Sequence, residues 1–233
     1  PNQELAFFYY DNSAKANNAA GNYNYARALQ NGIGTRKNIQ LACEYYEKAA
    51  KLGNADAMNS YGKLKEAGVV RRSKSLTNTT FSELNSESTY QPTKNPIKND
   101  LDDAAQYFKM SADAGNAEGM VNYARFLELG CASTVPKNIN ESAKFYKMAA
   151  DNGNADGMYN IARMLQGGIG ITKDLKLAFT YFQKASETGN TRAMNSTGFM
   201  LHKGLGTAKN DQEALKYFKM GAKAGLPVSM NNY

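Results

Sequence analysis

A six-residue theme, Ala-Ala-x-x-Gly-Asn, closes one segment of this 233-residue chain after another. It reads AAKLGN at residues 49–54 and AADNGN at 149–154, with looser copies at 111–116, 185–190 and 221–226. The spacings from one theme glycine to the next are 62, 38, 36 and 36 residues. A period near 36 is typical of supersecondary units stacked along one axis, each covering the apolar face of its neighbour. The chain is therefore predicted to be a repeat array and not a single globular core.

Each theme ends a predicted helix of about 14 residues, which we call helix B. An aromatic pair marks the middle of each copy: Tyr45-Tyr46, Tyr107-Phe108, Phe145-Tyr146, Tyr181-Phe182 and Tyr217-Phe218. Seven positions before each pair stands a residue of the N-cap type, namely Asn38, Asp100, Asn138, Asp174 or Asn210. Such a side chain accepts a hydrogen bond from the first free amides of a helix. The theme glycine is expected to end helix B in the left-handed conformation.

A second helix, helix A, is predicted after the theme asparagine, as in residues 57–66. Its apolar residues recur at helical spacing and form one broad face. It stops at Gly-x-Gly turns at residues 32–34, 168–170 and 204–206. Because these turns follow a helix and not a strand, they do not indicate a dinucleotide- or phosphate-binding loop. Each unit is thus predicted to be a helix–turn–helix hairpin.

The combined pattern of helix A, glycine turn, Asp/Asn cap, aromatic pair and Ala-Ala-x-x-Gly resembles the Sel1-like repeat (SLR). The resemblance covers nearly the whole chain, as about five units with partial units at both ends. It implies an all-α fold, a right-handed α/α superhelix related to the tetratricopeptide repeat. In one departure, the tryptophan frequent in the family's helix B pair is always Tyr or Phe in this chain.

Residues 1–233 are predicted to form a single array, interrupted once. Asp100 follows Gly68 by 32 positions, whereas in the other units the helix B cap follows the turn glycine by six to eight positions. The predicted insertion, residues 69–99, is rich in Ser, Thr and Asn and is expected to be a flexible surface loop. The alternative is a regulatory or docking segment that can be phosphorylated. Because the chain opens and ends inside repeats, it is expected to be a piece of a longer protein.

Helix A positions outside its core face recur in register. A column of cations comprises Arg27, Lys63, Arg125 and Arg163, with Phe199 in the last unit. Four residues earlier stand Tyr23, Asn59, Val121, Tyr159 and Asn195, and three later stand Gln30, Glu66, Glu128, Gln166 and His202. The spacing i, i+4, i+7 places these columns on one side of each helix A, which we call the helix A face.

The resemblance implies that the helix A face lines the concave surface of the superhelix and binds a partner. The predicted partner-binding residues are Tyr23, Arg27, Asn59, Lys63, Asn122, Arg125, Tyr159, Arg163, Asn195 and Phe199. Cations in such a row suit carboxylates, so the hypothesis is an acidic or carboxylate-terminated peptide of a protein partner. The alternative is that Lys63, Arg125 and Arg163 pair with Asp56, Glu118 and Asp156, seven residues earlier on the same helix.

Catalysis is not expected. His202 is the single histidine, and no base can be assigned to Cys43 or Cys131, so the sequence predicts no enzyme, no cofactor and no metal site. The net charge of +7 suits acidic partners, but nucleic acid is not expected. The chain contains no apolar run of the length that spans a membrane, and no membrane contact is expected from this segment.

Three functions stay open on the sequence. The favoured one is a protein–protein adaptor or scaffold, as the resemblance implies. The others are a luminal adaptor of endoplasmic-reticulum-associated degradation in a ubiquitin-ligase complex, and a structural subunit of a large assembly. The two cysteines lie in different parts of different repeats, so they do not indicate a disulfide framework. This favours the cytoplasm over the lumen.

Overall fold

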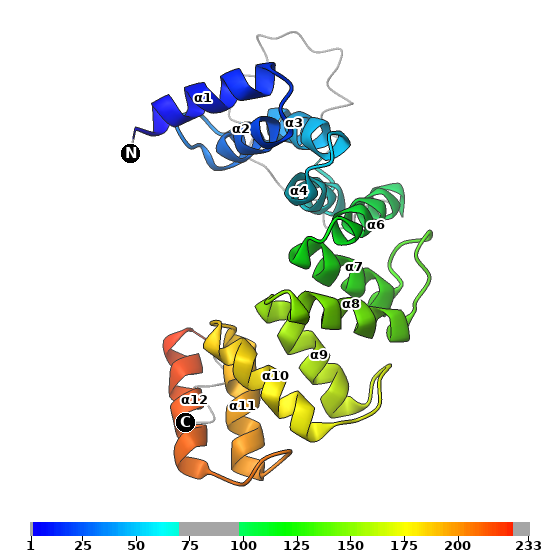
Figure 1. Ribbon diagram of the computed structural model, residues 1–233, viewed down its shortest axis with the longest axis vertical. Helices are drawn as coiled ribbons and strands as arrows, with labels where there is room; N and C mark the ends of the chain where they lie inside the picture. The colour runs from blue at the N-terminus through cyan, green and yellow to red at the C-terminus, as the bar shows by residue number, and fades with distance from the viewer. Residues whose placement is uncertain (1, 70–97, 226–233) are drawn as a thin grey trace. The chain divides into compact units, whose positions relative to one another are not determined.

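The computed structural model describes residues 2–69 and 98–225, and the regular elements in these ranges are α-helices. They are α1 (Gln3–Lys15), α2 (Ala19–Asn31), α3 (Ile39–Lys51), α4 (Ala55–Glu66), α6 (Lys98–Asp113), α7 (Ala117–Leu129), α8 (Ile139–Asp151), α9 (Ala155–Gly167), α10 (Leu175–Glu187), α11 (Thr191–Lys203) and α12 (Asp211–Lys223) (Figure 1). Helices α2, α4, α7, α9 and α11 are the predicted helices A, and the others are helices B. The prediction of an all-α chain of helix hairpins is confirmed. Residues 70–97 of the predicted insertion lie outside the described residues.

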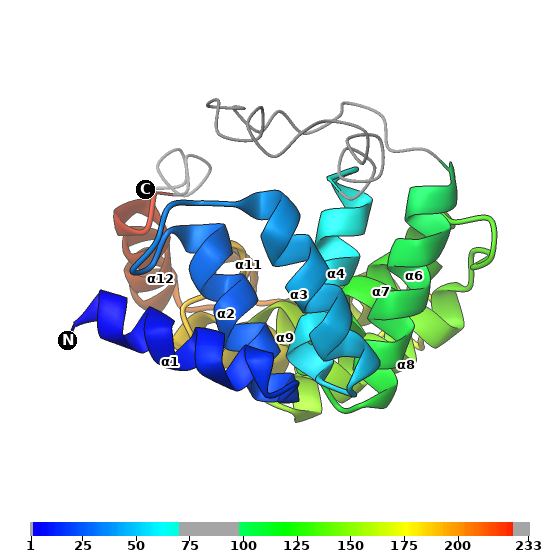
Figure 2. The same cartoon turned by 90° about the horizontal axis from the view of Figure 1, so that it is seen from above.

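The helices divide into two compact units. The first comprises Pro1–Gly119 with Cys131–Pro136, and the second comprises Met120–Gly130 with Lys137–Tyr233. Helix α7 begins in the first unit and continues in the second. Within the first unit, α1, α2 and α3 follow one another as neighbouring helices (Figure 2). Within the second, α11 and α12 form the last hairpin.

The helix ends are set by the predicted capping residues. Each helix B cap, at Asn38, Asn138, Asp174 and Asn210, accepts a hydrogen bond from the backbone amide three residues later. The theme asparagines Asn54, Asn116, Asn154 and Asn190 do the same for helix A. The theme glycines have φ between 80° and 92°, a left-handed conformation that costs glycine no Cβ clash.

Two predicted boundaries are wrong by about half a turn. Helix α4 begins at Ala55 and not at residue 57, because Asn54 caps the helix directly before it. Helix α6 begins at Lys98, so Asp100 lies in its first turn and is not its N-cap. Helix α6 can begin two residues before Asp100 because neither Lys98 nor Asn99 is a helix breaker. Asp100 still stabilises the helix, because a negative charge in the first turn interacts favourably with the helix dipole.

Aromatic contacts between successive helices build the core of each unit. In the first unit the rings of Tyr25 and Tyr45 meet edge-on with centroids 4.6 Å apart, and those of Tyr61 and Tyr107 meet in the same way at 4.7 Å. The second member of each helix B pair is buried deepest, and Tyr46, Phe108, Tyr146 and Phe182 are at most 2% exposed. The tandem aromatics are therefore core residues, as predicted.

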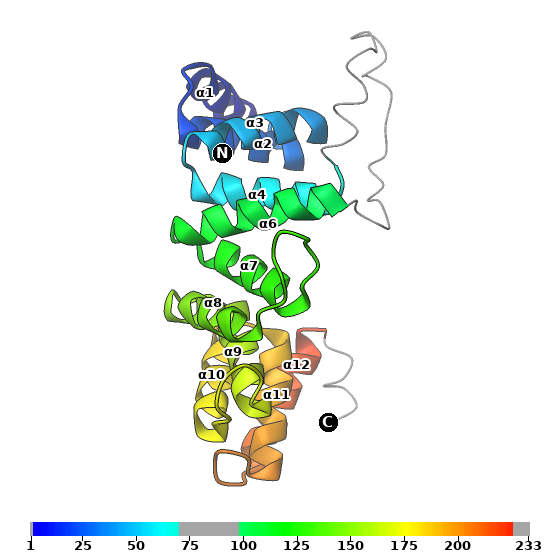
Figure 3. The ribbon, with the colours of Figure 1, turned by 90° about the vertical axis from the view of Figure 1, so that its right-hand side faces the viewer.

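The interrupted repeat has the same packing as an uninterrupted one. Helices α4 and α6 lie side by side (Figure 3). A Cβ at Gly62 of α4 would lie 2.8 Å from Cε1 of Phe108, and a Cβ at Gly198 of α11 would lie 2.7 Å from Cε1 of Phe218. Glycine at this register thus permits the close helix crossing in both hairpins. The long connection between α4 and α6 leaves the geometry of the pair unchanged.

Candidate functional site

The helix A face of the first unit contains two exposed cations, Arg27 and Lys63. Tyr23 is half-buried, with its ring centroid 5.8 Å from that of Tyr46. Desolvation by burial raises the pKa of Tyr23, so its hydroxyl stays protonated at neutral pH. Asn59 is only 3% exposed, which places this predicted binding residue inside the chain.

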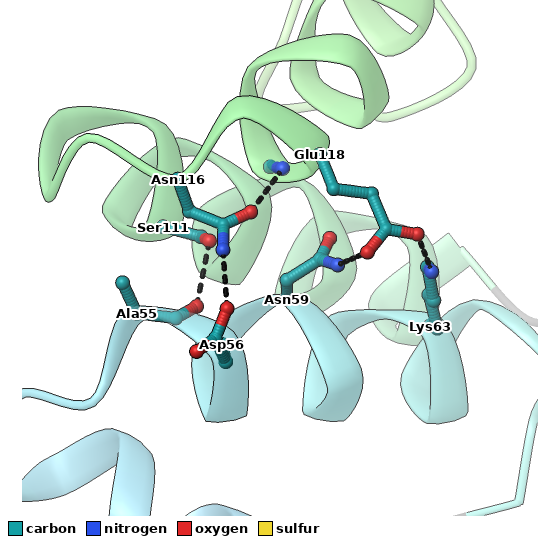
Figure 4. Close-up of polar contacts among 8 residues, drawn as sticks. Ala55, Asp56, Asn59, Lys63, Ser111, Asn116 and Glu118 are labelled. Carbon is teal, nitrogen blue, oxygen red and sulfur yellow. Dashed lines mark hydrogen bonds and ion pairs between the residues drawn. The ribbon is translucent and has the colours of Figure 1, made fainter. Parts of the chain in front are cut away.

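Glu118, in the first turn of α7, links this face to the next repeat (Figure 4). Its Oε2 accepts a hydrogen bond from Asn59 Nδ2 at 2.9 Å, and its Oε1 pairs with Lys63 Nζ. The sequence suggested Asp56, on the same helix as Lys63, as the alternative partner. That pairing is wrong for Lys63, because the carboxylate that meets its ammonium group comes from the following helix A.

The theme asparagine makes two hydrogen bonds with one side chain. Asn116 Oδ1 accepts from the amide of Gly119 at 2.7 Å, and its Nδ2 donates to Asp56 Oδ1 at 2.7 Å (Figure 4). In the second unit Asn190 Nδ2 donates to Asp156 Oδ1 at 2.8 Å, while its Oδ1 caps α11. Each of these asparagines therefore caps its own helix A and holds an aspartate of the preceding one.

In the second unit Arg163 pairs with a carboxylate of the preceding helix A. Its Nη2 lies 2.6 Å and 2.8 Å from the two carboxylate oxygens of Glu128, and Tyr146 donates its hydroxyl to Glu128 Oε2 at 3.1 Å. Burial and the charge of Glu128 both raise the pKa of Tyr146, which keeps the hydroxyl a donor. The alternative pairing of Arg163 with Asp156 is wrong, since Asp156 binds Asn190 and Glu128 binds Arg163.

The guanidinium group of Arg163 is held from one side only. Its Nη1 and Nε donate no hydrogen bond to any residue in the described ranges, and 34% of the side chain is exposed. Tyr159, one turn earlier on α9, is half-buried with its ring 5.7 Å from that of Phe182. An oriented arginine with remaining donors thus stands one helical turn from a half-buried aromatic residue on α9.

Arg192 is a functional candidate that the sequence reasoning missed. It occupies the first-turn position where the three preceding helices A have Asp56, Glu118 and Asp156. Its Cζ lies 5.5 Å from the ring centroid of Tyr159, a cation–π arrangement. The aligned repeats contain the signal for this residue, because the charge at this register changes from negative to positive in α11.

The other predicted residues of the second unit are placed as follows. Phe199 is 41% exposed, whereas Asn122, Arg125 and Asn195 are half-buried. Each of these three residues interacts with another residue of the chain. Arg125 Cζ lies 5.0 Å from the ring centroid of Phe126. A depression of about 320 Å³ is lined by Ala155, Asp156, Thr188, Gly189, Asn190, Thr191 and Arg192.

Groups that could carry catalysis are sparse. In residues 2–69 and 98–225, no cluster of three or more His, Cys, Asp or Glu side chains could hold a metal ion. Burial raises the pKa of the Cys43 thiol to about 12, so it stays protonated and unreactive at neutral pH. His202 is exposed and lies 2.7 Å from Asp211 through Nδ1. None of the described helices has the length and apolar character needed to cross a membrane.

Comparisons with solved structures place the chain among repeat proteins. A crystal structure of a Sel1 repeat protein from Oxalobacter formigenes is 26% identical, with 95% of this chain and 80% of that one covered and a TM-score of 0.75. A sel1 repeat protein from Klebsiella pneumoniae is 19% identical, with 96% and 95% covered and a TM-score of 0.54. An immunity protein from Pseudomonas aeruginosa is 13% identical, with 97% and 76% covered and a TM-score of 0.54. The last two likenesses show the fold alone.

The family model described as Sel1 repeat matches residues 1–18, 19–54, 94–116, 117–154, 155–190 and 191–226. No curated protein sequence matches the chain. Four of the matched stretches coincide with whole hairpins, α2–α3, α7–α8, α9–α10 and α11–α12. The structure adds the hairpin α4–α6, whose first helix lies outside the matched stretches. The chain belongs to the Sel1 repeat family and is a helical repeat scaffold.

Proposed function

We propose that this chain is a non-catalytic adaptor whose helix A faces bind an acidic, carboxylate-bearing segment of a partner protein. The observation that carries the proposal is the state of Arg163. Glu128 fixes its guanidinium through Nη2 alone, which leaves Nη1 and Nε without a hydrogen bond to any described residue. The Sel1 repeat fold supports a protein partner, because helical repeats present extended surfaces for binding.

Preorganisation is the physical reason for choosing Arg163. A flexible arginine loses side-chain entropy when it binds a ligand, whereas one already oriented by Glu128 loses less. The Nη1 and Nε of Arg163 lie on different edges of the guanidinium, and each can donate a charge-assisted hydrogen bond to a carboxylate oxygen of a partner. Tyr159, one turn earlier, adds amphipathic contact area at a fixed position. Together they form a binding site for an acidic side chain on α9.

The first unit supplies a second anchor of simpler form. Arg27 is exposed on α2, and it forms no ion pair with a residue in the part of the chain that the structure describes. Lys63 shares Glu118 with Asn59, so its ammonium group is partly neutralised. We therefore assign Arg27 the larger role in the first unit and give buried Asn59 no direct role.

Intrachain carboxylates also limit how strongly an acidic partner can bind. Glu118 and Glu128 offset part of the positive charge, so each helix A face is mixed and not uniformly basic. Binding should be specific in register, of moderate affinity and weakened by salt, since exposed charges are screened over about 8–10 Å at physiological ionic strength.

The test uses an acidic peptide library and one conservative variant. Arg163→Gln removes the cation without placing a second carboxylate beside Glu128, which a charge reversal would do. The matched control is Lys173→Gln, an exposed cation in the connection before α10. We expect Arg163→Gln to weaken binding of the acidic peptides by about tenfold and Lys173→Gln to leave it unchanged. Circular dichroism and thermal melting establish that both variants fold.

Equal binding by wild type and Arg163→Gln would contradict the proposed site. If no acidic peptide binds the wild type at low salt, the chain is better described as a structural subunit without a peptide groove. A loss that is equal in both variants would indicate a nonspecific effect of net charge.

A further inference from the structure

The helix A face changes character in its last repeat. The column position held by Arg27, Lys63, Arg125 and Arg163 is Phe199 in α11, and the first-turn position held by acids is Arg192. Phe199 is 41% exposed, a large apolar side chain at a column position that the other repeats fill with a cation. Both exchanges fall on the same helix and alter the chemistry that this helix offers.

We infer that α9 and α11 together bind an extended partner segment in which an acidic residue and an aromatic residue stand three positions apart. This deepens the proposed function and rests on it, because Arg192 adds a second contact for acidic residues of the partner to the one proposed at Arg163. The new element is the aromatic residue, which Phe199 would contact.

The acidic end of the segment is assigned to Arg192. This side chain is exposed, and no carboxylate of the described residues lies within ion-pair distance of its guanidinium. Its Cζ lies 5.5 Å from the ring centroid of Tyr159, whose other neighbour is the buried ring of Phe182. The arginine is thus supported by a ring that is itself packed, and Asp156 is bound by Asn190. A carboxylate from a partner is the complementary group.

The spacing follows from the geometry of α11. Arg192 and Phe199 are seven residues apart and therefore lie on one side of the helix, separated by about 10 Å along its axis. A partner segment in the polyproline II conformation advances about 3.1 Å per residue with three residues per turn, so two side chains three positions apart lie on one side of it, about 9 Å from each other. One acidic and one aromatic side chain at that separation meet Arg192 and Phe199 together.

The aromatic end is supported by the chemistry of Phe199. Aromatic side chains pair through offset or edge-to-face contacts, and they are the commonest anchors of interfaces. A cation at this position, as in the four other repeats, would instead select a second acid. The last repeat is therefore the one that distinguishes among acidic partners.

The experiment compares four fluorescein-labelled peptides that differ only in their central residues: Asp-Ser-Ser-Phe, Phe-Ser-Ser-Asp, Asp-Ser-Ser-Ser and Ser-Ser-Ser-Phe. Fluorescence anisotropy gives the affinity of each for wild type and three variants. Phe199→Lys restores the column cation, and Arg192→Gln removes the guanidinium. Leu177→Lys is the matched control, because Leu177 is also 41% exposed in the second unit but lies on a helix B.

We expect one of the two peptides that contain both residues to bind wild type at least about fivefold more tightly than Asp-Ser-Ser-Ser. Phe199→Lys should abolish that preference while keeping the binding of Asp-Ser-Ser-Ser, and Leu177→Lys should keep the preference. Arg192→Gln should weaken every peptide that contains Asp.

Four results would overturn the inference. A preference that survives Phe199→Lys, or that Leu177→Lys removes equally, excludes Phe199 as the contact. Equal binding of the peptides with and without Phe refutes the inference but leaves the proposed function standing. No binding of any peptide that contains Asp refutes both.

Discussion

The theme asparagine shows what one side chain adds to a repeat. Its Oδ1 caps helix A, as the sequence predicts, because capping depends only on neighbours along the chain. Its Nδ2 donates to an aspartate of the preceding helix A at Asn116 and at Asn190. That second bond could not be predicted from the spacing within one helix, since it depends on which residue the preceding repeat places opposite. Asn54 differs from Asn116 and Asn190, because the corresponding residue of the preceding helix A is Ala20, whose side chain cannot accept a hydrogen bond.

Replacing Asn116 or Asn190 by Asp should destabilise the chain, whereas Asn54→Asp should not. Aspartate caps a helix as well as asparagine does, but it cannot donate to Asp56 or Asp156 and repels them. We expect each of the first two variants to lose about 1 kcal/mol of unfolding free energy, or about 2–4 °C in Tm. Thermal denaturation measures the difference. Equal melting of all three variants would show that the Asn–Asp bonds contribute nothing.

Asn22 is a buried polar residue at a position where the four other helices A have Met58, Met120, Met158 and Met194. It is 1% exposed, and its Oδ1 has no hydrogen-bond partner among the described residues. Asn22→Met should therefore stabilise the chain by about 1–2 kcal/mol, because it removes an unsatisfied acceptor and buries apolar surface. Chemical denaturation tests this, with Met58→Asn as the reverse control. A destabilised Asn22→Met would contradict the account of this site.

At the scale of the element, the hairpins follow closely from the sequence. Period, caps and the aromatic pair predict the helices because each is a local property of the chain. The sequence predicts helix starts less accurately, as at α4 and α6, because the first turn needs no buried residue and leaves no apolar signal. The insertion before α6 disturbs the family pattern but not the packing of Gly62 on Phe108, which depends on helices and not on their connection.

Shortening the insertion tests whether it acts as a loop. Replacing residues 70–97 by four Gly/Ser residues gives the same separation that lies between Gly130 and Asn138, eight residues. The connection becomes about fourfold shorter. If the segment is a flexible loop, the lower entropy cost of closing it should raise the free energy of unfolding by about 1 kcal/mol. Thermal unfolding measures it. A less stable variant would show that the segment packs on the helices, contrary to the predicted loop.

The connection between α7 and α8 is fixed to α6 by an acidic side chain. Asp102 accepts hydrogen bonds from the backbone amide of Thr134 at 3.0 Å, from its hydroxyl at 3.2 Å and from the hydroxyl of Ser133. Hydrogen bonding by Ser133 and then Thr134 lowers the pKa of Asp102 below its ordinary value of 3.8. These hydrogen bonds hold the α7–α8 connection against α6, the helix that precedes α7.

The lowered pKa predicts an acid-sensitive contact. A carboxylate whose folded-state pKa is depressed stabilises its contact above the unfolded value, and the contribution is lost as pH falls through the folded pKa. The amide resonance of Thr134 should therefore be constant above pH 5 and shift with a midpoint below 3.8. Two-dimensional NMR across this range gives the midpoint, and Asp102→Asn should abolish the titration. A midpoint above 3.8 would show that the hydrogen bonds do not form.

At the scale of the whole molecule, the repeats supply a scaffold, and we propose that the exceptions to the repeat supply specificity. The family and its fold could be predicted because they rest on residues that recur. The pairs Lys63–Glu118 and Arg163–Glu128 could not, because the sequence does not show which neighbouring carboxylate a long side chain reaches. Arg192 and Phe199 depart from the residues at their register in the other repeats, and a recurring pattern does not predict the role of Arg192, which is an exception to it.

The most direct measurement of the central claim is NMR mapping of an acidic peptide on the isotopically labelled chain. Binding at the helix A face predicts shifts in the amides of α9 and α11 around Tyr159, Arg163 and Arg192 that saturate with peptide and weaken with salt. Amides near Lys147 and Lys184, exposed cations on helices B, should not move. Shifts centred on helices B, or none at saturating acidic peptide, would contradict the claim that the helix A face binds the partner.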